Sequence, residues 1–258
     1  MAVITAEDRV ALTDSLHRLL ADKSAESDVR RAMETPTGYD PELWRQLAEM
    51  GVVGLIVEEA YGGVGAGPVE LERVMEEAGA ALLCAPLLSS GVLAAGLLQA
   101  LDDEAAKTRL LPAIADGSKI ATVALTGVKG GWTLGDVSVS AEARGDDAWA
   151  LSGVAGFVTD GQGADLLLES ESAISAARNA AAKLADGAKD AGEALSLAAF
   201  ACADAYSTIT ATAIQMHGGI AFTWAHPAHL YLRRARADAQ LFGGSAQHRE
   251  RYLKELGA

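Results

Sequence analysis

Apolar residues recur at helical intervals through most of the first 117 residues. Thr5 precedes an acidic first turn and a run of leucines, as an N-cap does, and Pro41 opens a short helix that Gly51 stops. The polar stretch 22–40 is expected to be a surface connection. Further helices are predicted over 69–81, 90–101 and 103–115.

From Ser118 the apolar pattern shortens and alternates, which is typical of strands. Strands are predicted at 120–125, 137–141, 148–151, 156–159 and 165–168. After Leu168 an Ala-rich segment without proline, from about 173 to 216, returns to helix. The predicted fold is mostly α with a small β domain: an N-terminal helical domain over 1–117, a partial β domain over 118–168 and a partial C-terminal helical domain over 169–258.

A glycine-rich stretch, residues 51–65, separates two of the N-terminal helices. Its glycine density favours a loop in which the backbone turns tightly or packs closely. A phosphate-binding loop would need a following lysine and a serine or threonine, and none is present. A tight structural loop is therefore the better interpretation.

Composition and charge limit the classes of binding partner that this chain is expected to have. The chain has 258 residues, half of them apolar, and a formal charge of −14, so its field does not favour nucleic acid or an anionic membrane. The first residues, which are acidic and lack an apolar run, are not expected to be a signal peptide. The apolar run 78–101 is broken by Pro86 and polar residues, as two buried helices would be. Cys84 and Cys202 are expected to be buried thiols of a cytoplasmic protein.

Near the C-terminus the sequence reads Gln-Met-His-Gly-Gly-Ile-Ala-Phe from Gln215, with Arg-Arg-Ala-Arg from 233 and Leu-Phe-Gly-Gly from 241. Gly218 and Gly219 fit a helix C-terminus, where they supply positive φ and let a neighbouring group approach closely. The arginines could face an anionic group. An ordinary C-cap beside a solvated basic face explains the same residues.

These residues form the pattern Gln-x-x-Gly-Gly-Ile-x-Phe, followed by Arg-x-Ala-Arg and Leu-Phe-Gly-Gly. This pattern resembles the C-terminal motif of the acyl-CoA dehydrogenase family. Three further blocks are similar to family blocks in order and spacing: residues 43–51, the loop 58–65, and Leu-Pro-x-x-Ala-x-Gly at 111–117. The resemblance covers nearly the whole chain. It implies the same α, β, α order of domains and an FAD-dependent oxidoreductase that dehydrogenates acyl-CoA thioesters.

The resemblance also implies roles for particular residues. Ala-Leu-Thr at 124–126 and Gly-Phe-Val-Thr-Asp-Gly at 156–161 stand where family members meet the flavin. The expected FAD-binding residues of this chain are Thr126, Phe157, Thr159, Gln215, Gly218 and Gly219, the last three reaching the FAD of another subunit. No metal is implied, so His217, His226 and His229 are expected to be surface or interface histidines.

Two departures from the family pattern bear on function. The block that holds the catalytic Glu in many members reads Phe-Gly-Gly-Ser here, which leaves Gly243 at the carboxylate position, with one residue of alignment slip allowed. Residues 165–168 also join directly to what resembles a later helix, so the Arg-x-x-Phe-Gly region of the family is absent. A naturally short chain, an engineered deletion and a sequence recorded without an internal segment all fit.

Such losses resemble one subunit type of the bacterial heterotetrameric acyl-CoA dehydrogenases, which act on bulky acyl-CoA substrates including steroid side-chain intermediates. There a partner supplies the Glu while the other subunit completes the FAD site, and electron-transfer flavoprotein is the electron acceptor by family resemblance. Two alternatives stay open. One is a self-sufficient homo-oligomer with Glu58 or Glu59 as base, and the other is a scaffold that has lost its flavin.

Overall fold

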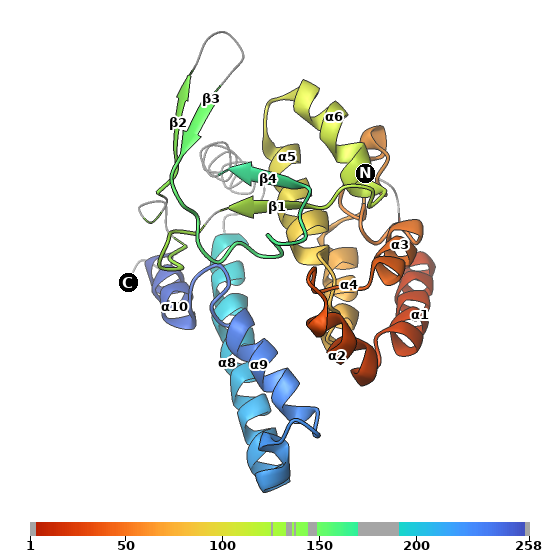
Figure 1. Ribbon diagram of the computed structural model, residues 1–258, viewed down its shortest axis with the longest axis vertical. Coiled ribbons are helices and arrows are strands. Elements are labelled where there is room, and N and C mark those ends of the chain that lie inside the picture. The colour runs from red at the N-terminus through yellow and green to blue at the C-terminus, as the bar shows by residue number, and fades with distance from the viewer. Residues whose placement is uncertain are drawn as a thin grey trace. The chain divides into compact units, whose positions relative to one another are not determined.

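The computed structural model describes residues 4–124, 126–132, 136, 138–143, 149–169 and 191–255. The chain separates into two compact units (Figure 1). The first unit comprises Met1–Gly130 with Val137–Ala177, and the second comprises Gly131–Asp136 with Arg178–Ala258. The expected domain boundaries at 117 and 168 stay predictions.

The first unit begins with a series of helices. They are α1 (Ala6–Lys23), α2 (Glu26–Glu34), α3 (Pro41–Glu49), α4 (Pro68–Ala80), the π-helix η2 (Leu87–Ala94), α5 (Ala95–Ala100) and α6 (Glu104–Ala115), with the 3₁₀ turn η1 (Glu59–Tyr61). The predicted helix starts are confirmed at three caps. The side chains of Thr5, Asp40 and Asp103 each accept a hydrogen bond from a backbone N–H in the first turn of the helix that follows.

The predicted surface connection over 22–40 is wrong in its middle, where α2 forms. Its sequence is highly polar, but Val29 and Ala32 lie on one face and are buried. The Asp28 carboxylate accepts a hydrogen bond from the Ala25 N–H at 3.2 Å, which satisfies a donor at the helix start. Two buried side chains and a good N-terminus therefore suffice for a helix here.

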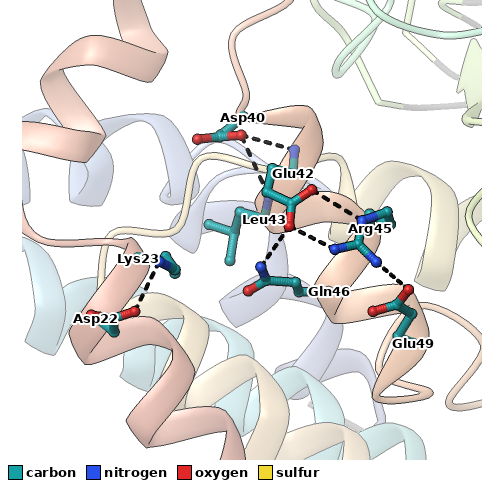
Figure 2. Close-up of polar contacts among 8 residues, drawn as sticks. All are labelled: Asp22, Lys23, Asp40, Glu42, Leu43, Arg45, Gln46 and Glu49. Carbon is teal, nitrogen blue, oxygen red and sulfur yellow. Dashed lines mark hydrogen bonds and ion pairs between the residues drawn. The ribbon is translucent and has the colours of Figure 1, made fainter.

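Helix α3 shows how polar residues fix a short helix at both of its ends (Figure 2). The Asp40 carboxylate accepts hydrogen bonds from the backbone N–H groups of Glu42, at 2.8 Å, and Leu43. Arg45 pairs with Glu42 at 2.6 Å and also with Glu49. Hydrogen bonds from Arg45 and then Gln46 lower the pKa of the Glu42 carboxyl to about 2.

Two clusters of apolar side chains form the core of the first unit. One includes Leu16 and Leu47, and the other includes Leu111 and Ile114, all fully buried. Trp44 in the first cluster donates its indole N–H to the Gly117 carbonyl at 2.9 Å. This bond ties α3 to the end of α6, immediately before the first strand.

The glycine-rich stretch is a tight structural loop, as predicted. Gly51, Gly62 and Gly65 have φ values of 77°, 84° and 68°, which favour glycine. The Gly65 N–H donates to the Val57 carbonyl at 2.7 Å and closes the loop. At Gly63 an added Cβ would lie 2.1 Å from the same carbonyl oxygen, so only glycine fits there.

The β structure consists of two strand pairs. Strand β1 (Ala121–Ala124) pairs in parallel with β4 (Leu166–Glu169), with Ala121 opposite Leu166, and β2 (Ser140–Ala143) pairs antiparallel with β3 (Trp149–Ser152) (Figure 1). The strands predicted at 120–125, 148–151 and 165–168 are confirmed in their described residues. The one predicted from 137 lies a few residues later, and 156–159 forms no strand.

In the second unit α8 (Ala191–His217) is followed by the 3₁₀ segment η4 (Gly218–Phe222), α9 (Ala228–Asp238) and α10 (Ser245–Glu255). Residues 173–190 of the predicted long helix lie outside the described residues. Helix α10 packs on α8 through Phe200 and Tyr252, whose rings are 5.8 Å apart, and through Arg249, which pairs with Asp204 at 2.7 Å.

Among the described residues, no helix is both long enough and apolar enough to cross a membrane. Both cysteines are free thiols, but the expectation that both are buried is wrong. Cys84 is half-buried, and Cys202 is exposed on α8. An apolar sequence neighbourhood did not place Cys202 inside, because a helix in such a neighbourhood still keeps one face outward.

Candidate functional site

In the first unit, the segment 156–161 is a turn that backbone reversals and two threonines define. Phe157 and Asp160 both have a φ of 54°, in the left-handed region, so the chain cannot continue there as the predicted strand. Thr122 on β1 donates its hydroxyl to the Thr159 carbonyl at 2.5 Å, and Thr126 donates to the Gly156 carbonyl. Both threonines are buried.

The turn presents Phe157 to the outside. The residue is 76% exposed, although its ring lies against Gly130, where an added Cβ would be 3.3 Å from the ring. Thr159, two residues later, is half-buried. An exposed aromatic face beside a rigid turn is a surface on which a flat ring can stack. Thr126, Phe157 and Thr159 are therefore brought together in one turn region.

In the second unit the predicted helix C-terminus at the glycine pair is confirmed. Helix α8 ends at His217, and Gly218 has a φ of 64°. A Cβ built on Gly218 or on Gly219 would meet no heavy atom of this chain within 4 Å. Gln215, on the last turn of α8, is exposed. The structure thus leaves open space around both glycines, and an FAD molecule could approach the backbone closely here.

Three histidines and Trp224 lie close to the glycine pair in the sequence and form two ring contacts. The rings of His217 and His226 are 4.6 Å apart, and those of Trp224 and His229 are 4.9 Å apart. His217 is exposed, whereas His226 and His229 are half-buried. Within the described parts of the chain, no group of three or more His, Cys, Asp or Glu side chains could hold a metal ion.

Gly243 lies in a sharp turn between α9 and α10. Its φ is 103°, which side-chain-bearing residues rarely adopt, and Phe242 before it has a φ of 61°. The Phe242 ring packs against Trp132 with 5.3 Å between centroids. A Cβ on Gly243 would lie 2.2 Å from the Gln247 side-chain oxygen. The backbone at this position is shaped for glycine.

Three buried hydroxyl residues that bond to the turn at 156–161 or to the neighbouring strand β1 were not identified from the sequence as part of the site. Thr122 was assigned only to a strand, and Ser89 and Ser90 only to a break in an apolar run. All three are fully buried. A signal was present, because hydroxyl groups within a buried apolar segment need hydrogen-bond partners, but it does not identify those partners.

Two protein-family models match this chain. The family model described as Acyl-CoA dehydrogenase, N-terminal domain, matches residues 6–118, and the C-terminal domain model matches residues 141–257. "Acyl-CoA dehydrogenase IpdE2" from Mycolicibacterium smegmatis is 27% identical, with 97% of this chain and 99% of that protein covered. The alignment spans 316 residues, more than the 258 of this chain, so IpdE2 contains internal residues without a counterpart here.

Two solved structures are similar in fold. The ChsE4–ChsE5 complex from Mycobacterium tuberculosis has a chain that aligns with a TM-score of 0.79 at 20% identity, covering 100% of this chain and 99% of that one. A variant of the Tcur3481–Tcur3483 steroid ACAD aligns with a TM-score of 0.72 at 19% identity, covering 97% and 98%. These likenesses confirm the predicted fold class. The two family models together match most of the sequence, so the chain belongs to the acyl-CoA dehydrogenase family, whose members use FAD.

Proposed function

We propose that this chain is a subunit of a heteromeric, FAD-dependent acyl-CoA dehydrogenase, in which it completes the FAD site while a partner subunit supplies the catalytic Glu. The observation that carries the proposal is the backbone at Gly243. Where many family members have the Glu, this chain has a buried glycine with a φ of 103°. The position cannot accept a proton, and its backbone does not suit a glutamate.

The reaction removes two hydrogens from neighbouring carbons of an acyl-CoA thioester. A carboxylate base takes the α-carbon proton, which is acidic because the thioester carbonyl is adjacent, and a double bond forms. Bound FAD would supply the acceptor for the β-hydride, and electron-transfer flavoprotein would be the acceptor of its electrons. Base and flavin must lie on opposite faces of the substrate, so a subunit without a base can still form the flavin side.

Six residues of this chain would serve that flavin side. In the first unit, Thr126 stabilises the turn, Phe157 would flank the flavin ring and Thr159 would hydrogen-bond near it. In the second unit, Gln215 and the open glycine pair, Gly218 and Gly219, would contact the FAD of a neighbouring subunit. This division of roles requires an oligomer.

Partner and substrate classes follow from the same proposal. The ChsE4–ChsE5 structure is a complex of two different proteins, and the Tcur3481–Tcur3483 protein is described as a steroid enzyme. Their fold likeness supports a two-subunit enzyme for a bulky acyl-CoA, such as a steroid side-chain thioester. A cytoplasmic location completes the proposal and suits the free thiols of Cys84 and Cys202.

The decisive experiment purifies this chain alone and also from a host that expresses its genomic neighbours. Each preparation is mixed with a panel of acyl-CoA thioesters without oxygen, and the visible flavin spectrum is recorded. We expect bleaching only where a second polypeptide co-purifies. Bleaching by the chain alone would overturn the partner requirement and direct attention to Glu58 and Glu59. Absence of flavin from every preparation would support the scaffold instead.

A glutamate placed at position 243 should not give this chain a catalytic base. Gly243→Glu is expected to leave the isolated chain without acyl-CoA-dependent bleaching and to destabilise it by about 1–3 kcal/mol, because its φ of 103° is strained for a residue with a side chain. Gly244→Ala is the matched control. The nearest atom to its Cβ is 4.0 Å away and its φ is not positive, so its thermal midpoint should hardly change. Substrate-dependent bleaching by the glutamate variant alone would contradict this prediction.

A further inference from the structure

The π-helix η2 contains two fully buried serines, one bonded to the turn at 156–161 and one bonded to strand β1. Ser89 and Ser90 are both 0% exposed. Short π-helical segments are rare and are frequently found at functional sites. Gly91 lets η2 pack closely on the glycine-rich loop, since an added Cβ there would lie 2.7 Å from the Val53 carbonyl oxygen. The serines are therefore held firmly in the core of the first unit.

The two serines have different partners. The Ser90 hydroxyl oxygen accepts a hydrogen bond from the Ala121 N–H of β1 at 3.0 Å. Ser89 donates its hydroxyl to the Asp160 carboxylate at 2.6 Å, and the Pro86 carbonyl lies farther away at 3.2 Å. A hydroxyl has one proton, and the short, charge-assisted bond to the carboxylate is the stronger of the two. Ser89 thus links η2 directly to the turn, whereas Ser90 links it to the sheet.

The turn needs such a link because its backbone is strained. Asp160 and Phe157 both have a φ of 54°, and for the bulky Phe157 this conformation is an outlier. Strained residues keep such conformations only when their surroundings fix them. Thr126 fixes Gly156 and Thr122 fixes Thr159, but both bonds reach carbonyl groups. The Ser89 bond instead holds a side chain, the Asp160 carboxylate, near the far end of the turn.

We propose that Ser89 and Asp160 are positioning residues for FAD: their hydrogen bond holds the turn in the conformation that exposes Phe157 and sets Thr159 beside it. The inference rests on the proposed function, in which this turn borders the flavin. Neither side chain needs to touch FAD. Their effect reaches the cofactor through Phe157, which is 76% exposed and lies where the backbone reverses.

The test compares Ser89→Ala with Ser90→Ala in the flavin-containing complex. Both changes remove a fully buried hydroxyl from the same helix, so both should lower the thermal midpoint by similar amounts. Only Ser89→Ala should weaken FAD binding, by about tenfold or more in Kd measured by titration of the apoprotein with FAD. It should also alter the visible circular dichroism of the bound flavin. Ser90→Ala should leave Kd within about twofold of the parent protein, which is less than 0.5 kcal/mol.

Asp160 variants keep the test valid if Ser89→Ala folds poorly. Asp160→Asn retains an acceptor for Ser89 and tolerates a left-handed backbone, so it should keep most of the FAD affinity. Asp160→Ala loses both features and should match Ser89→Ala, and the double alanine variant should be no worse than either single one. Equal FAD affinity and an unchanged flavin spectrum in Ser89→Ala and Asp160→Ala would overturn the positioning role alone. A parent complex that binds no FAD would overturn the proposed function as well.

Discussion

Replacing Gly63 with alanine is expected to destabilise the first unit by about 3 kcal/mol, an unusually large effect for a single added methyl group. The new Cβ would lie 2.1 Å from the Val57 carbonyl oxygen and 2.4 Å from the Val57 Cβ. Val57 is fully buried, and its carbonyl accepts the Gly65 N–H at 2.7 Å. The backbone cannot move away without breaking the loop, because the clash involves main-chain atoms.

Two other glycines of the first unit provide matched controls. Gly62→Ala adds a methyl where no atom lies within 4 Å, but its φ of 84° makes it cost about 1 kcal/mol. Gly79→Ala lies in α4 with equal free space and no positive φ, so it should be neutral or stabilise by up to about 1 kcal/mol. Urea unfolding followed by circular dichroism measures all three. Equal losses in the free energy of unfolding for Gly63→Ala and Gly62→Ala would show that the structure adjusts to relieve the clash, and would contradict the prediction.

Helix starts were predictable because their determinants lie within a few residues. Thr5, Asp40 and Asp103 each cap the helix that follows them, and Pro41 fits the first helical position. The glycine pair after α8 was predictable for the same reason. Local hydrogen bonds at a helix end do not depend on the rest of the fold.

Features set by distant residues were not predictable. Residues 156–159 have a strand-like sequence, but hydroxyl groups from β1 and the segment after it fix the turn, and the backbone reverses at Phe157. Helix α2 was missed because only Val29 and Ala32 mark its buried face. The π-helical geometry of η2 has no sequence pattern that distinguishes it from an α-helix. In each case tertiary contacts decided between conformations that the sequence alone allowed.

The candidate site likewise combines features that the sequence indicates with features that only the structure shows. Motif similarity indicates the residue types, whereas the structure adds the backbone conformations that suit or exclude a given role. The sequence shows that Gly243 lacks a carboxylate, and its φ of 103° adds that a glutamate would not suit the backbone there. The buried Ser89–Asp160 hydrogen bond joins residues 71 positions apart, so no local pattern indicates it.

Gly219→Leu is expected to remove FAD from the assembled enzyme without destabilising this chain. No heavy atom of the chain lies within 4 Å of its Cβ position, and its φ is not positive, so this position offers space for a side chain without backbone strain. Gly218 is a poorer choice, because its φ of 64° would add strain to any effect on the cofactor. If the Gly219→Leu variant loses FAD, the leucine must therefore collide with a group that lies close to the glycine and is not part of this chain.

The measurement combines the thermal midpoint of the isolated chain with FAD content and Kd in the co-purified complex. The leucine should leave the midpoint unchanged and raise the Kd for FAD by at least about tenfold, because its side chain would occupy the space that the proposal assigns to FAD. Ala237→Leu, an exposed position on α9 in the same unit, controls for the added apolar surface and should retain FAD. Full FAD content in Gly219→Leu would show that nothing approaches the glycine pair closely. The open space after α8 would then be an ordinary helix end, and the FAD contact would have to be sought on the Phe157 turn alone.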